Sequence, residues 1–75
     1  MQKNMAFDFK KLRALMIEKY GSQTEFAKAY GVSENTMSRK MQNKVPFSSD
    51  DVIKISEMLG ISKDDVGSYF FTEKV

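Results

Sequence analysis

One segment of the sequence carries polar side chains at helical spacing. Asn35 is followed after three, four and seven residues by Ser38, Arg39 and Gln42, so the four side chains share one face of a helix. Arginine can bind guanine O6 and N7 with two hydrogen bonds, and asparagine and glutamine can bind adenine N6 and N7 in the same way. This row therefore has the chemistry to contact base edges in a DNA major groove, with Gln42 as the fourth candidate.

Glu34 precedes the row and has two interpretations that remain open. A carboxylate near DNA phosphates is repelled, so its presence needs a reason. Its oxygen atoms either accept a hydrogen bond from a cytosine amino group or complement the helix dipole at the start of this helix.

A second set of polar residues is suited to contact DNA phosphates. Ser22 and Gln23 lie where a helix is expected to begin, and the free backbone amides of a helix N-terminus favour anions. Thr36, Asn43 and Lys44 lie within and just after the row. For each of these residues the alternative is an ordinary solvated polar side chain.

Five helices are expected to position these side chains, because the chain is punctuated by helix caps rather than by strand signals. Segments such as Ser22–Glu25 and Ser48–Asp51 have the pattern of a capping box. The expected cap residues at the helix starts are Asp8, Ser22, Ser33, Ser48 and Ser62, and the expected stops are Gly21, Gly31, Asn43 and Gly60. Met37 and Met41 face inward opposite the polar row. The sequence predicts an all-α fold.

The break between the second and third expected helices has three positions with steric roles. Ala27 is small where the two helices approach each other, and Gly31 supplies the positive φ of the turn. Val32 is apolar because it lies beneath both helices. A short helix, a three-residue break containing a glycine and another short helix form the geometry of a helix-turn-helix.

At these residues the sequence resembles the phage Cro/repressor-like helix-turn-helix family, also called the xenobiotic-response-element family. The matching segments are Gln23…Ala27…Gly31-Val-Ser33, Thr36-Met-Ser-Arg39 and Ile55…Leu59-Gly-Ile-Ser62. The resemblance covers about residues 9–70. It implies a compact five-helix, lambda-repressor-like DNA-binding domain whose third helix lies in the major groove while the second crosses above it.

The sequence departs from this family at two positions. Lys40 stands where many members carry a large apolar residue, and Asn43 stands where many carry glycine. Met41 is expected to take the inward position instead.

The charge distribution favours a polyanionic partner. The net charge is +2, but residues 1–47 hold nine basic and four acidic residues, whereas residues 48–75 hold three basic and six acidic residues. No acidic residue lies between Asn35 and Ser49. Such asymmetry suits a protein with one face toward nucleic acid, and a chance distribution on a solvated surface is the alternative.

The composition excludes several classes of site. There is no cysteine and no histidine, which removes disulfides, thiolate metal sites and the commonest acid/base group. The pairs Asp50/Asp51 and Asp64/Asp65 lie in first helical turns, where acids cap the helix, and no third oxygen ligand lies at metal spacing. The six methionines are expected to fill the core. We expect no enzymatic activity, metal, cofactor or small-molecule substrate.

The 75 residues are expected to form a single domain with a short N-terminal arm, residues 1–7, and a short C-terminal tail, residues 71–75. No segment is apolar and long enough to span a membrane, so we expect a cytoplasmic protein of a bacterial cell or a phage-infected host.

The end of the chain carries more aromatic side chains than one helix face can bury. Phe70 and Phe71 point about 100° apart on a helix, so they cannot both face the core. We therefore expect Tyr69, Phe70 and Phe71 to hold a homodimer on a two-fold operator, with half-sites about 34 Å apart.

Taken together, these features predict a sequence-specific, double-stranded-DNA-binding transcriptional regulator, a Cro-like phage or prophage repressor. The alternative is a protein-binding module, an antitoxin-like or anti-repressor adaptor with the same fold. The basic third helix argues against this alternative, because protein-binding faces are enriched in exposed aromatic residues.

Overall fold

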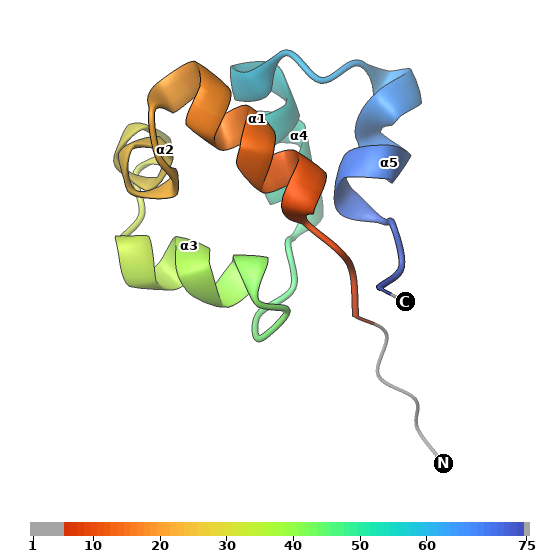
Figure 1. The fold of residues 1–75 in the computed structure, drawn as a ribbon, viewed down its shortest axis with the longest axis horizontal. Coiled ribbons are helices and arrows are strands. Elements are labelled where there is room, and N and C mark those ends of the chain that lie inside the picture. Colours follow the sequence, from red (N-terminus) through yellow and green to blue (C-terminus); the bar gives the residue numbers. More distant parts are fainter. Residues whose placement is uncertain (1–5, 75) are drawn as a thin grey trace.

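The computed structural model describes residues 6–74, and these residues form an all-α fold, as the sequence predicts (Figure 1). The elements are α1 (Lys10–Tyr20), α2 (Gln23–Tyr30), α3 (Glu34–Met41), α4 (Ser49–Leu59), a 3-10 turn over Lys63–Asp65, and α5 (Val66–Phe70). Among these residues, none of the helices has the length and apolar character needed to cross a membrane.

Three helix starts are capped as the sequence predicts. The side-chain oxygens of Ser22, Ser33 and Ser48 each accept a hydrogen bond of 3.0 Å from the backbone N–H three residues further on. Ser48 also has the reciprocal bond of a complete capping box. At Ser22 only the serine bond of the capping box is present. The Glu25 carboxylate pairs with the Lys28 ammonium group instead, with Oε2 and Nζ 3.3 Å apart.

The first helix begins one residue later than the sequence predicts. Phe9, not Asp8, is the N-cap residue of α1, although the Asp8 carboxylate accepts a 2.9 Å hydrogen bond from the Lys10 N–H. The Asp8 N–H donates to the Thr72 carbonyl at 2.8 Å, and the Phe9 carbonyl accepts the first helical hydrogen bond, from the Arg13 N–H at 2.8 Å. The bond to Thr72 holds Asp8 against the tail.

The last helix also differs from its prediction at its start. The Ser62 side chain makes no capping bond to a backbone N–H, and its hydroxyl donates to the Asp65 carboxylate at 3.1 Å. Residues 63–65 form a 3-10 turn, and α5 is a five-residue helix.

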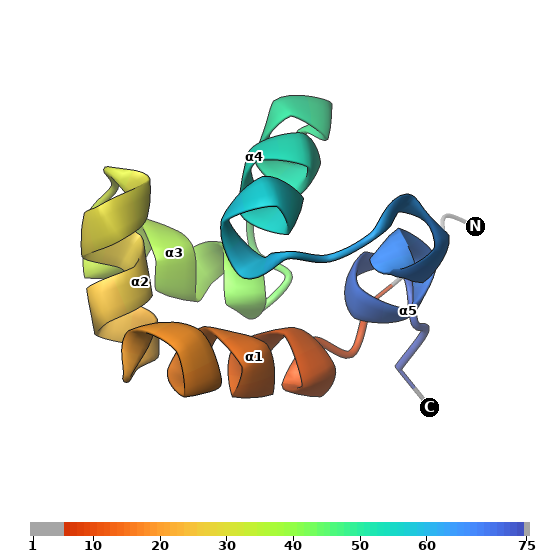
Figure 2. The same ribbon diagram turned by 90° about the horizontal axis from the view of Figure 1, so that it is seen from above.

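All five helices contribute to one core. Figure 2 shows α1 and α4 on opposite sides of the molecule, with α2 at one end and α5 at the other. The buried apolar side chains are Phe9, Leu12, Met16, Phe26, Ala27, Tyr30, Met37, Met41, Ile55, Leu59 and Phe70. The predicted inward pair of α3, Met37 and Met41, is among them.

The two ends of the described chain pair with each other. Phe7 and Glu73 form an antiparallel β-bridge, and the Lys74 N–H donates to the Ala6 carbonyl at 2.9 Å. The predicted arm and tail are therefore joined to each other where the structure describes them. Residues 1–5 and 75 of that prediction lie outside the described residues.

The predicted dimer contact at Phe70 is wrong. Phe70 is 1% exposed and belongs to the core, because α5 turns this ring toward Phe47, with the ring centroids 5.5 Å apart. Phe71 is 54% exposed and lies edge-on against Phe7. Tyr69 is half-buried beneath the Lys11 ammonium group, which lies 4.6 Å from the ring centroid. Of the adjacent pair Phe70 and Phe71, Phe71 is exposed, as the 100° step between neighbouring residues of a helix requires.

Candidate nucleic-acid interface

Helices α2 and α3 are joined by a tight turn at residues 31–33. Gly31 has φ +98°, and its N–H and that of Val32 both donate to the Ala27 carbonyl, at 2.9 and 3.1 Å. A residue with a side chain is strained at this positive φ. Ala27 is fully buried and Val32 is half-buried against the core. The steric roles of the three residues in a helix-turn-helix stay a prediction.

The turn leaves one face of α3 free. Asn35 and Arg39 are exposed, as is Gln42 just after the helix, and Ser38 is half-buried between them. The Gln42 amide donates to the Ser38 hydroxyl at 2.9 Å, which brings these two members of the row together. The structure thus places the predicted row opposite the buried methionines. Contact with bases stays a prediction for these residues.

Glu34 is exposed in the first turn of α3. This position fits the dipole interpretation, and it also leaves the carboxylate free to accept a hydrogen bond. Both interpretations of Glu34 therefore remain.

The side chains of the candidate phosphate contacts differ in their burial and in the hydrogen bonds that they already make. Ser22 caps α2, and the Gln23 Oε1 atom is buried without a hydrogen-bond partner among the described residues. The Thr36 hydroxyl accepts from the Ser33 hydroxyl at 2.9 Å. Lys44 is exposed just beyond α3.

Asn43 has a role that the sequence does not predict. Its φ of +64° lies in the left-handed region, which explains an asparagine where glycine is common. Its Oδ1 accepts from the Phe7 N–H and its Nδ2 donates to the Phe7 carbonyl, both at 2.9 Å. The side chain therefore ties the end of α3 to the arm. The phosphate contact of Asn43 stays a prediction.

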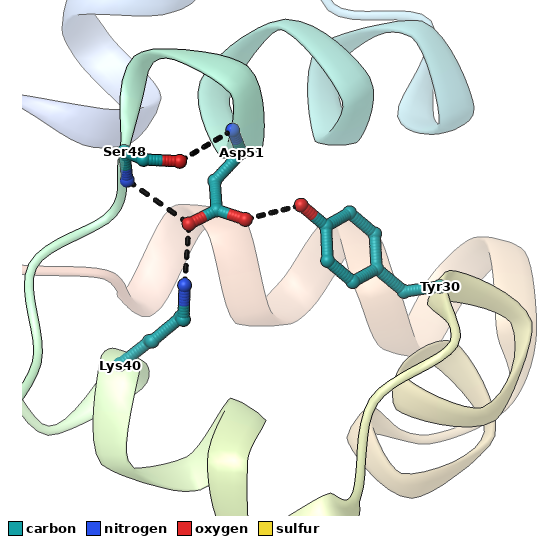
Figure 3. A network of polar contacts seen from close by, with 4 residues as sticks. All are labelled: Tyr30, Lys40, Ser48 and Asp51. Carbon is teal, nitrogen blue, oxygen red and sulfur yellow. Dashed lines mark hydrogen bonds and ion pairs between the residues drawn. The ribbon is translucent and has the colours of Figure 1, made fainter.

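A buried polar network fixes α3 relative to its neighbours (Figure 3). The Asp51 carboxylate, on α4, accepts hydrogen bonds from the Tyr30 hydroxyl on α2 and the Lys40 ammonium group on α3. It also accepts from the Ser48 N–H at 2.9 Å. Asp51 is 8% exposed. One carboxylate thus links three helices.

The network explains why Lys40 can replace a large apolar residue. A cation that faces the interior needs a buried acid as its partner, and Asp51 supplies it. The sequence-based interpretation of Asp51 as a helix cap is correct but incomplete. The inward position of Lys40 was the signal that could have led to its partner.

The network also shifts two pKa values. Burial alone would raise the pKa of Asp51, but the hydrogen bonds from Lys40, Tyr30 and Ser48 outweigh it and hold this pKa well below its usual range. Burial raises the pKa of the Tyr30 hydroxyl well above its usual range, and the hydrogen bond to Asp51 adds to the effect. At neutral pH, Asp51 is therefore charged and Tyr30 is neutral.

Two comparisons with known proteins give matches. Residues 5–73 match the model of a family described as a protein of unknown function, DUF739. A similar solved structure is the solution structure of the modulator of repression of the temperate bacteriophage TP901-1 from Lactococcus lactis. The sequence identity is 37%, the match covers 87% of this chain and 88% of that chain, and the TM-score is 0.79. No curated protein sequence matches the chain.

Proposed function

The chain belongs to the DUF739 family of proteins of unknown function, and we propose that it is a phage regulatory protein that binds duplex DNA through the exposed face of α3. The similarity to a phage modulator of repression supports the regulatory role. One observation carries the DNA-binding part of the proposal: the exposed face of α3 holds Asn35, Ser38 and Arg39 opposite a fully packed inner face.

In this proposal α3 lies in the major groove, where its side chains contact base edges, and a contact to a backbone phosphate positions the helix. Arg39 binds a guanine and Asn35 binds an adenine. Lys44, exposed just after α3, contacts a backbone phosphate, which fixes the register without reading sequence. The function needs no catalytic step and no cofactor, and it places the protein in the cytoplasm of a bacterial cell.

Arg39→Ala and Lys44→Ala are expected to weaken DNA binding in different ways. Loss of a bidentate base contact should cost about 1–3 kcal/mol and relax the preference at one base pair. Loss of a phosphate contact should weaken all sequences alike and reduce the salt slope by about one. Competition binding with single-base operator variants measures both effects, and Lys63→Ala, distant from α3 in the sequence, is the control. Equal, sequence-independent losses for Arg39→Ala and Lys44→Ala would make Arg39 a backbone contact.

We further propose that the protein binds a two-fold operator as a dimer, through Phe71 and Tyr69. A second protomer doubles the base and phosphate contacts of so small a domain. The exposed Phe71 ring supplies an apolar contact without unpacking the core.

Phe71→Lys is therefore expected to bind a palindromic duplex more weakly and without cooperativity. Sedimentation with and without the duplex measures stoichiometry. Phe71→Leu, which keeps an apolar side chain, is the matched control. If the wild type binds one-to-one and Phe71→Lys binds equally well, the dimer proposal is wrong.

A second candidate function is a protein-binding modulator that uses the same helices against a protein partner. The name of the similar phage protein, a modulator of repression, favours it, because modulation of repression does not in itself require contact with DNA. Absence of duplex binding at low salt would favour this candidate over the first.

A further inference from the structure

A pocket with both polar and apolar lining residues lies where the arm, the start of α1, the end of α3 and the tail meet. Its volume is about 160 Å³, and three basic side chains line it: Lys10 and Arg13 from α1, and Lys74 from the tail. Asn43 lines it from the α3 side. The space is large enough for several waters or one phosphate group.

The positive charge of this pocket is not neutralised within the described chain. The ion pairs among residues 6–74 join Lys28 to Glu25 and Lys40 to Asp51, so they do not involve the three basic residues of the pocket. Asp8 also lines the space, but its carboxylate already accepts the Lys10 N–H at 2.9 Å. Three cations against one acid leave a site that attracts an anion.

Backbone contacts, rather than long side chains alone, assemble the pocket. The Lys74 N–H donates to the Ala6 carbonyl at 2.9 Å, and the neighbouring Glu73 forms the bridge with Phe7. The Asn43 side chain holds the Phe7 backbone through two hydrogen bonds. Lys74 is therefore fixed beside α1 at the end of α3.

We propose that this pocket binds one phosphate of the DNA backbone, outside the stretch of duplex that α3 contacts. The inference rests on the proposed DNA binding and extends it to residues far from α3 in the sequence. Figure 1 shows α3, the described end of the arm and the tail along the same side of the molecule. A duplex against α3 therefore passes near the pocket, and the phosphate fixes the position of α3 along the groove.

The double variant Lys10→Gln/Lys74→Gln tests this site. It keeps both backbone hydrogen bonds and removes two charges. We expect binding to a selected duplex to weaken roughly tenfold or more, and the salt slope to become less steep by about one for each protomer bound. Ethylation interference should be lost at one outer phosphate and kept at the others. Lys19→Gln/Lys63→Gln is the matched control, because it removes the same charge elsewhere.

Three outcomes would overturn the inference. The first is equal weakening in the two double variants, which would show an effect of net charge only. The second is an unchanged interference pattern in a variant that keeps the melting temperature of the wild type. The third combines two results. Inorganic phosphate shifts the NMR signals of the backbone amides of residues 8–13 in the wild type, and Lys10→Gln/Lys74→Gln keeps all the DNA contacts of the wild type. Together they would show that the pocket binds a free anion and not a DNA phosphate. If the wild type binds no duplex, the proposed DNA binding itself is wrong. This result differs from the three outcomes above, in which the wild type binds duplex but the pocket does not bind its phosphate.

Discussion

Replacement of Asp51 with alanine is expected to lower the free energy of unfolding by about 3 kcal/mol or more. The variant leaves the Lys40 ammonium group without its acid in a largely buried position and removes the acceptor of the Tyr30 hydroxyl. It also breaks the capping box at Ser48. Urea denaturation followed by circular dichroism measures the loss.

Asp50→Ala is the matched control for this prediction. Asp50 is in the same first turn of α4 but is exposed, so its removal should change stability by about 0.5 kcal/mol or less. Similar losses in the two variants would show that helix capping and dipole effects, rather than the buried network, account for the role of Asp51.

The same network sets the stability of the protein in acid. The pKa of Asp51 is lower in the folded chain than in the unfolded chain, so its contribution is fully present above the unfolded value of about 3.9. It is lost as the pH falls through the range below that value, toward the folded pKa. The difference in unfolding free energy between the wild type and Asp51→Asn should therefore shrink on acidification below about pH 4.

Local signals account for what the sequence predicts correctly. The side chains of Ser22, Ser33 and Ser48 cap helices through hydrogen bonds to the backbone three residues further on. Such caps can be recognised from a few consecutive residues. The inward methionines and the outward face of α3 follow from helical periodicity. These features were enough to predict five helices and the exposure of Asn35 and Arg39.

Long-range contacts account for what the sequence does not predict. The Asp8 N–H bonds to the Thr72 carbonyl in the tail, and the Asn43 side chain bonds to the Phe7 backbone in the arm. A hydrophobicity pattern contains no information on such polar pairs. Lys40 and Asp51 meet only after α3 and α4 pack, so a single sequence shows two charges and not their pairing.

A steep dependence of the affinity for duplex DNA on salt concentration is the second large effect that we expect. Contact with about five to eight phosphates per dimer would give a slope of log K against log salt of roughly −4 to −7. Affinity would then fall roughly 250-fold to 16,000-fold between about 50 and 200 mM salt. Counterion release from the duplex is the cause, and the basic side chains proposed to contact phosphates, among them Lys44 and Lys10, would produce it.

The most direct test of DNA binding through α3 is a salt titration of the wild type and of Asn35→Ala/Arg39→Ala on a duplex obtained by random-site selection. We expect a steep dependence of log K on log salt for both proteins. Preference for the selected site over random duplex should be lost only in the variant. A flat salt response, or no selected duplex at low salt, would contradict DNA binding. Equal site preference in the two proteins would contradict recognition through α3.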